Sequence, residues 1–153
     1  MHALELKVPP VAVTVVFGAI MWAISTVFPA ASFSLPRASV VAVAVALTGG
    51  GIALAGVLAF RRHETTVNPM KPETTASVVT SGIYGVTRNP MYLGLALALL
   101  AWAIYLANLA ALLLVPAFVA YMTRFQIRPE ERALSEKFGS RFEDYMAAVR
   151  RWI

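Results

Sequence analysis

The chain has 153 residues, of which 59% are hydrophobic and 14% are charged. With a mean hydropathy of +0.70, this composition excludes an ordinary soluble domain and predicts an all-α polytopic membrane protein. The absence of cysteine excludes disulfides, thiolate zinc sites and thiol nucleophiles, and the net charge of +5 suits anionic headgroups better than nucleic acid.

Three uncharged intervals, 8–36, 38–60 and 89–123, predict the transmembrane helices. Each is longer than the roughly 18 to 20 apolar residues that a spanning helix needs. The last interval has 35 residues and one strongly polar residue near its middle, Asn108, so it predicts two short spans that meet there. We therefore expect about four spans, near 10–29, 38–60, 90–107 and 109–127.

The distribution of Lys and Arg predicts the orientation. Of the 13 basic residues, 12 fall in the N-terminal tail, in the 61–89 segment or at the C-terminal end, and only Arg37 falls between the first two spans. The positive-inside rule then places both termini and the 61–89 segment in the cytoplasm. Within the second span, Gly49-Gly50-Gly51 predicts close helix packing. The two histidines, His2 and His63, are too few and too far apart for a metal site.

The 61–89 segment is predicted to be an irregular loop because it contains two prolines and, later, Gly82 and Gly85. Asn89-Pro90 predicts the start of the third span, since Asn can cap free N–H groups and Pro loses no hydrogen bond at the first helical position. The positive end of this helix would face the cytoplasm, where it suits an anionic ligand group.

Beyond the fourth span, apolar residues recur at helical spacing and predict amphipathic helices over the cytoplasmic mouth of the bundle or in the headgroup layer. Gly139 followed by Ser140 and Glu143 resembles a stop and then a capping box, so two short helices are expected. Glu130 and Glu131 have a purely structural alternative, because acidic residues after Pro129 favour a helix N-terminus by roughly 0.3 to 1 kcal/mol each.

Taken in order, three groups of residues resemble the isoprenylcysteine carboxyl methyltransferase and phospholipid methyltransferase superfamily of integral membrane enzymes. The groups are Val79-Thr80-Ser81-Gly82-Ile83-Tyr84, then Arg88-Asn89-Pro90-Met91-Tyr92-Leu93-Gly94, then Glu130-Glu131 with Leu134, Phe138-Gly139 and Tyr145. The resemblance runs from about Thr65 to the end of the chain and does not extend to the first two spans.

The resemblance implies S-adenosylmethionine as cofactor, no metal, and a lipophilic acceptor. The cofactor would lie between the third and fourth spans, the 61–89 loop and the 128–153 helices, on the cytoplasmic face. The implied cofactor contacts are Val78, Val79, Tyr84, Arg88, Asn89, Pro90, Met91, Tyr92, Gly94 and Glu130. The candidates for the reaction itself are Glu130, Glu131, Arg124 and Arg128.

The chain departs from the family pattern at three positions. Asn89 stands where the family commonly has the His of an Arg-His-Pro motif. Ala76 stands where the family often has a His just before the apolar patch. Gln126 stands where the isoprenylcysteine enzymes are expected to have an Arg that faces the substrate carboxylate, which counts against carboxylate methylation.

The acceptor stays open between an isoprenoid carboxylate, which needs no base, and a phospholipid amine, which must lose a proton that Glu130 or Glu131 could accept. Two alternatives from other classes are a nicotinamide-dependent enzyme related to the sterol reductases and a non-catalytic membrane scaffold. A transporter is disfavoured because the spans contain no ionisable residue for coupling.

Overall fold

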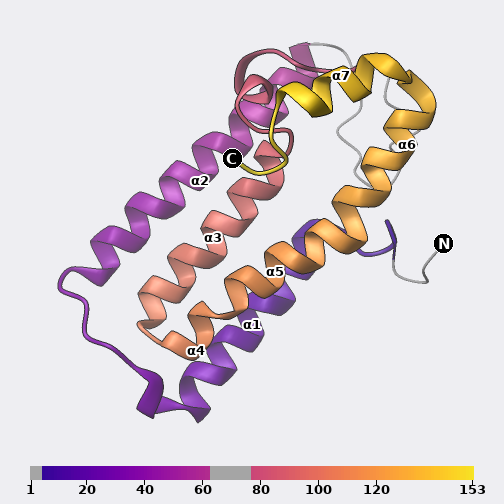
Figure 1. Cartoon of the computed structure of the whole chain (residues 1–153). Helices are drawn as coiled ribbons and strands as arrows, with labels where there is room; N and C mark the ends of the chain where they lie inside the picture. The colour runs from indigo at the N-terminus through magenta and orange to yellow at the C-terminus, as the bar shows by residue number, and fades with distance from the viewer. Residues whose placement is uncertain (1–4, 63–76) are drawn as a thin grey trace.

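The computed structural model describes residues 5–62 and 77–153 as an all-α protein (Figure 1). The fold class predicted from composition is therefore confirmed. Residues 63–76 of the predicted 61–89 loop, with its two prolines, His63 and Ala76, lie outside the described residues, as does His2. The helical elements are α1 (Pro10–Val27), η1 (Pro29–Ala31), α2 (Ala38–Arg62), η3 (Gly82–Gly85), α3 (Pro90–Leu106), α4 (Leu109–Leu112), α5 (Leu114–Met122), η4 (Thr123–Ile127), α6 (Arg128–Phe138) and α7 (Ser140–Ala148).

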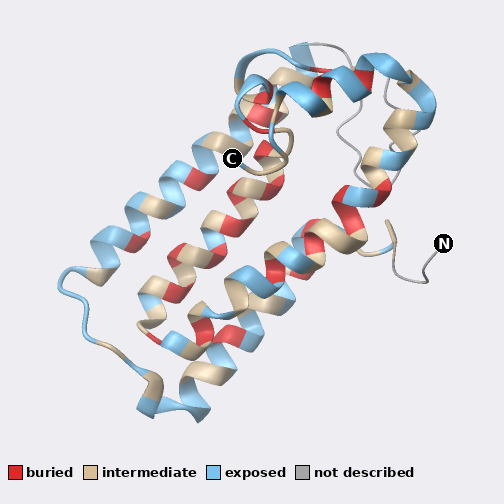
Figure 2. Cartoon of the chain, viewed as in Figure 1, coloured by how far each residue is buried: buried red, intermediate tan, exposed pale blue. Residues whose placement is uncertain are grey.

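Helices α1, α2 and the helical run Leu109–Phe138 are long and apolar enough to cross a membrane, and α3 is a shorter apolar helix of 17 residues. Their outer faces are exposed in the isolated chain (Figure 2). Large apolar side chains occupy those faces, including Val15 on α1 and Leu47 on α2, which are 66% and 72% exposed. An exposed apolar surface of this extent is what an integral membrane protein presents to lipid.

Helix α2 packs on α3 through residues without bulky side chains. A Cβ atom added to Gly94 would lie 2.6 Å from both the Ala53 Cβ and the Gly49 carbonyl oxygen. One to two turns toward the start of α3, a Cβ on Gly56 would lie 3.0 Å from the Pro90 ring. The close packing predicted for the glycine run is thus found at Gly49. Gly50 has no neighbour within 4 Å of such a Cβ.

The predicted turn at Asn108 is confirmed. It lies at the end of the bundle away from α6 and α7, and it connects the turn between α3 and α4 to the loop that follows α1. Ala107 adopts a left-handed conformation (φ 47°), which ends α3. The fully buried Asn108 side chain accepts a hydrogen bond from the Ala111 N–H at 3.1 Å and donates one to the Phe28 carbonyl at 3.0 Å. This residue therefore starts α4 and ties it to the end of α1.

The fourth predicted span does not end at residue 127, because the helix continues through η4 into α6. Thr123–Ile127 form a π-helical turn in which the Arg128 N–H donates to the Thr123 carbonyl, five residues back. Pro129 has no N–H and cannot bond to the carbonyl of Phe125 four residues earlier. The Leu6 N–H supplies that carbonyl with a donor at 3.1 Å. The N-terminal segment thus satisfies the group that the proline leaves free.

The break at Gly139 is confirmed, since its φ of +56° separates α6 from α7. The predicted capping box is wrong. Ser140 is already the first residue of α7, and no side chain caps this helix because its N-cap position is Gly139. Since α6 continues the helix before it, its first N–H groups are not the free ends that would make Glu130 and Glu131 merely favourable helix-start residues.

The spacing between α2 and α3 predicts opposite effects for two matched substitutions. Gly94→Ala should lower the melting temperature in detergent, by overpacking worth about 1 to 3 kcal/mol. Gly50→Ala should leave it unchanged or raise it, because Ala is favoured over Gly in a helix by about 1 kcal/mol and has open space at this position. Equal melting temperatures for the two variants would contradict the packing described here.

Candidate functional site

Four segments that are distant in sequence meet at the start of α3. They are the η3 loop, the first turn of α3, the η4–α6 region and the extended chain after α7, which passes close to α3 in Figure 1. The resemblance to a methyltransferase pointed to the first three segments. The geometry of their side chains decides what each of them can do.

Glu130 is the centre of a hydrogen-bonded cluster. The Tyr92 hydroxyl donates to its Oε1 at 2.5 Å, and the Gln126 Nε2 donates to the same oxygen at 2.6 Å. Tyr92 and Gln126 are buried. Among the described residues, the Glu130 carboxylate pairs with no cation. Since both of these bonds end on Oε1, the other oxygen, Oε2, is the one best placed to meet a ligand.

The surroundings of Glu130 shift the pKa of its carboxyl group toward neutral pH. Six of the eleven residues of α6 are charged. We therefore expect α6 to lie outside the hydrocarbon layer, beyond the apolar helical run that precedes it. Burial raises the pKa of Glu130 to about 7, the hydrogen bonds from Tyr92 and Gln126 lower it, and the neighbouring Glu131 raises it. A carboxylate with this pKa can accept and release a proton under physiological conditions.

Glu131, the next residue, is held by two arginines. Its Oε1 lies 2.9 Å from the Arg88 Nη2, and Arg151 binds both oxygens, with Nε at 3.0 Å and Nη2 at 2.7 Å. The Arg88 Nη1 also donates to the Met146 carbonyl at 3.0 Å. These bonds join α6 to the segment before α3 and to the chain after α7. Glu131 therefore clamps these segments together, whereas Glu130 has no such ion pair among the described residues.

The chain after α7 completes this arrangement, and sequence reasoning missed it. The Arg150 carbonyl accepts from the Arg88 N–H at 3.1 Å, and the Trp152 Nε1 donates to the Thr123 hydroxyl at 3.1 Å. The side chain of Asn89 donates to the Arg151 carbonyl at 2.9 Å. The prediction that Asn89 caps α3 is thus wrong, although the helix does begin at Pro90. Nothing in the local pattern of Arg150 to Trp152 signals these long-range contacts.

The η3 loop and α7 together form a buried cluster that is largely aromatic. Its central residues are Val79, Tyr84, Phe142 and Tyr145, and Val78 packs against it. The Tyr145 hydroxyl donates to the Tyr84 carbonyl at 2.7 Å. Burial first, and then the neighbouring Tyr145 and Glu130, raise the pKa of Tyr84, so its hydroxyl keeps its proton.

Two buried polar atoms in the described part of the chain have no hydrogen-bond partner, the Tyr84 hydroxyl and the Arg88 Nε. Leaving a buried polar group unpaired costs about 1 to 3 kcal/mol. Both atoms are donors, and both belong to residues that line the cluster around Glu130 and Glu131. The site is thus suited to a ligand that brings hydrogen-bond acceptors such as carboxylate or hydroxyl oxygens.

The remaining predicted site residues have other contacts. Pro90 and Met91 lie against Gly56 of α2, and Gly94 lies against Ala53, so helix packing accounts for Gly94 without a ligand. Arg124 and Arg132 bind Glu5 at 3.1 and 2.7 Å, which fixes the N-terminal segment on α6.

Arg128 is exposed and lines a cleft of about 460 Å³ between α6 and the chain after α7. Glu131 and Arg151 line the same cleft, so Arg128 lies on the rim of the site.

Two comparisons with known proteins gave matches. The phospholipid methyltransferase family matches residues 38–141, from the first residue of α2 to the second residue of α7. An uncharacterized protein of Haemophilus influenzae is 46% identical over 63 residues, which are 41% of this chain and 100% of that protein. No solved structure matches the chain.

The clamp predicts that the two neighbouring acids respond differently to substitution. Glu131→Gln should lower the free energy of unfolding in detergent by about 1 to 3 kcal/mol, because it leaves partly buried guanidinium groups without their charged partner. Glu130→Gln should have a smaller effect, since an amide can still accept from Tyr92. The assignment of Glu131 as the clamp fails if Glu130→Gln is the more destabilising of the two.

Proposed function

Because the chain belongs to the phospholipid methyltransferase family, we propose that it transfers a methyl group from S-adenosylmethionine to the amine of a membrane lipid headgroup. The observation that carries the proposal is Glu130, a carboxylate with neutral hydrogen-bond partners and a pKa of about 7. An amine headgroup is cationic at neutral pH and must lose a proton before it can attack a methyl group.

The residues around Glu130 are suited to the cofactor. The unpaired donors of Tyr84 and Arg88 fit the carboxylate and ribose oxygens of S-adenosylmethionine. No side chain caps the N-terminus of α3, so its first N–H groups also suit an anionic group. Val78 and Val79, which precede η3, and Met91, in the first turn of α3, would supply apolar contacts to the cofactor. When bound, the cofactor provides a sulfonium methyl whose positive charge is dispersed as the methyl group is transferred.

The arginines favour an amine acceptor over a carboxylate. Arg88 and Arg151 both bind Glu131, Arg124 binds Glu5, and Arg128 is exposed on the rim. A carboxylate substrate would need a cation free to face it, whereas Arg151 and Arg124 are bonded to other acids and Arg128 lies on the rim. The remaining donor of Arg88 is the one proposed above for the cofactor. A cationic headgroup would instead be drawn to Glu130.

In the reaction, Glu130 Oε2 accepts the proton of the ammonium group, while Tyr92 and Gln126 hold Oε1 in place. The amine freed of this proton could then take the methyl group that the sulfonium of the bound cofactor would supply, with the sulfur keeping the electron pair of its bond to carbon. Alignment of these atoms and exclusion of water are the main remaining requirements. The buried cluster of Val79, Tyr84, Phe142 and Tyr145 covers one side of the site and excludes water there.

We place this site at the cytoplasmic surface, where the water-soluble cofactor is available. The basic residues near α6, α7 and the start of α3 support this orientation through the positive-inside rule. The lipid would reach the same site from within the membrane. Protease protection of tags placed in the 61–89 segment of the protein in sealed vesicles tests the orientation.

Methyl transfer should depend on Glu130 far more than on an exposed acid. We expect detergent-purified protein to bind S-adenosylhomocysteine and to methylate phosphatidylethanolamine, and Glu130→Gln to reduce the rate by about 100-fold or more. Glu143→Gln, an exposed acid on α7, is the matched control and should retain the rate. Absence of S-adenosylhomocysteine binding by the unmodified protein would overturn the proposal. Binding of a nicotinamide cofactor in its place would support a reductase.

The pKa of Glu130 predicts the pH dependence. Below pH 7 the carboxyl group holds its proton and cannot accept another, so kcat/KM should rise with pH through a midpoint of about 7. Tyr92→Phe removes a hydrogen bond that lowers this pKa, so its midpoint should move to higher pH. The same midpoint in the unmodified protein and in Tyr92→Phe would contradict the role given to Glu130.

A further inference from the structure

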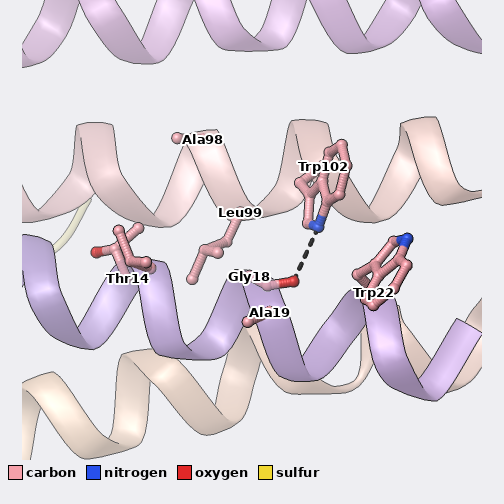
Figure 3. A pocket seen from close by; sticks show the side chains of 8 residues that line it. Thr14, Gly18, Ala19, Trp22, Ala98, Leu99 and Trp102 are labelled. Atoms are coloured by element: carbon pink, nitrogen blue, oxygen red, sulfur yellow. Dashed lines mark hydrogen bonds between the residues drawn. The ribbon is translucent and has the colours of Figure 1, made fainter.

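A second hollow lies away from the polar site, between α1 and α3 (Figure 3). Its volume is about 400 Å³, and its walls include Gly18 and Ala19 of α1 and Ala98 and Leu99 of α3. Gly18, Ala19 and Ala98 have small side chains or none, which leaves the space open beside Leu99. Trp22 and Trp102 lie at one end of it, as the close view shows. We name this hollow the α1–α3 groove.

Two polar side chains that line the α1–α3 groove, Trp102 and Thr14, are bonded within the protein. The Trp102 Nε1 donates to the Gly18 carbonyl at 3.1 Å, which fixes α3 against α1. The Thr14 hydroxyl donates to the Pro10 carbonyl at 2.9 Å. Apart from the indole of Trp22 at one end, the remaining surface is hydrocarbon, so the groove offers its contact area mainly to an apolar occupant.

The α1–α3 groove lies farther along α3 than its start, where Tyr92 meets Glu130. Met91, Leu95, Ala98 and Trp102 recur at intervals of four, three and four residues, so they form one stripe along α3. Helix α2 contacts α3 at Gly94 and Leu97 and also at Met91, so the part of this stripe nearest the start of α3 lies beside α2. At 1.5 Å per residue, the groove begins roughly 9 Å from Tyr92 and extends to roughly 15 Å from it.

The dimensions of the groove select among occupants. Thr14 to Trp22 span roughly 12 Å of helix, so the volume corresponds to a cross-section of roughly 30 Å². A helix about 10 Å across needs more than twice that area. An extended hydrocarbon chain fits, and the groove lies along helices whose surroundings are lipid.

From this geometry we propose that the α1–α3 groove holds one hydrocarbon chain of the lipid whose headgroup is methylated at Glu130. This inference rests on the proposed function, because it needs a lipid acceptor. The depth of the groove matches the arrangement of such a molecule, whose chains lie deeper in the membrane than its headgroup. Ala98 and Gly18 then determine how well a chain binds, and they do so without touching the reacting atoms.

Filling the groove tests the proposal. Ala98→Phe places a ring in it, and Ala46→Phe places the same ring on an exposed alanine of α2 as the matched control. We expect Ala98→Phe to raise the KM for long-chain phosphatidylethanolamine about tenfold, as the loss of contact with two methylene groups would. The KM for a water-soluble headgroup analogue without chains, and the affinity for S-adenosylhomocysteine, should not change. Equal effects on long-chain and chainless acceptors would overturn the proposal.

A measurement that does not need catalysis separates this inference from the proposed function. In a Trp22→Phe, Trp152→Phe background, Trp102 reports on the groove by its fluorescence. Phosphatidylethanolamine with brominated chains, titrated in detergent, should quench it saturably, and Ala98→Phe should abolish the saturable part. Quenching in this background, together with no methyl transfer by the unmodified protein, would support the groove and refute the proposed function. Methyl transfer without saturable quenching would refute the groove alone.

Discussion

The ion cluster around Glu131 is the constraint on which the site depends. Its carboxylate is 13% exposed and lies between a guanidinium that precedes α3 and one that follows α7. Three segments are joined at this one acid, so its removal would leave two guanidinium groups without the partner that they share. Two cations and a bidentate bond offset the cost of burying the charge. The cluster therefore holds the groups around it in position.

Two neighbouring acids thus acquire different properties from their surroundings alone. Glu131 is paired with two arginines, whereas Glu130 meets a phenol and an amide in a partly buried position. Separating the surroundings of two carboxyl groups is a general way to obtain one structural and one reactive acid. Gln126, which stands where an Arg was expected, is one of the groups that make this difference, since an Arg there would pair with Glu130.

Local chemistry was sufficient to predict the elements whose cause is local. Pro90 begins α3, Asn108 makes the turn, and Gly139 separates α6 from α7, because each position has a backbone preference that shows in a single sequence. The resemblance then pointed to Tyr92 and Glu130. Contacts between distant segments could not be predicted this way. Asn89 bonds to the Arg151 carbonyl where a cap was expected, and the continuity of α6 with α5 depends on a donor from Leu6.

The π-helical turn at Thr123–Ile127 has a consequence for the register of everything that follows it. An α-helical turn would need one residue fewer, and each residue rotates the helix by about 100° and advances it by about 1.5 Å. Glu130 therefore faces Tyr92 only with the extra residue in place. The number of residues between Met122 and Glu130 is part of the definition of the site, so relatives with a one-residue deletion there cannot be assigned the same acid by alignment alone.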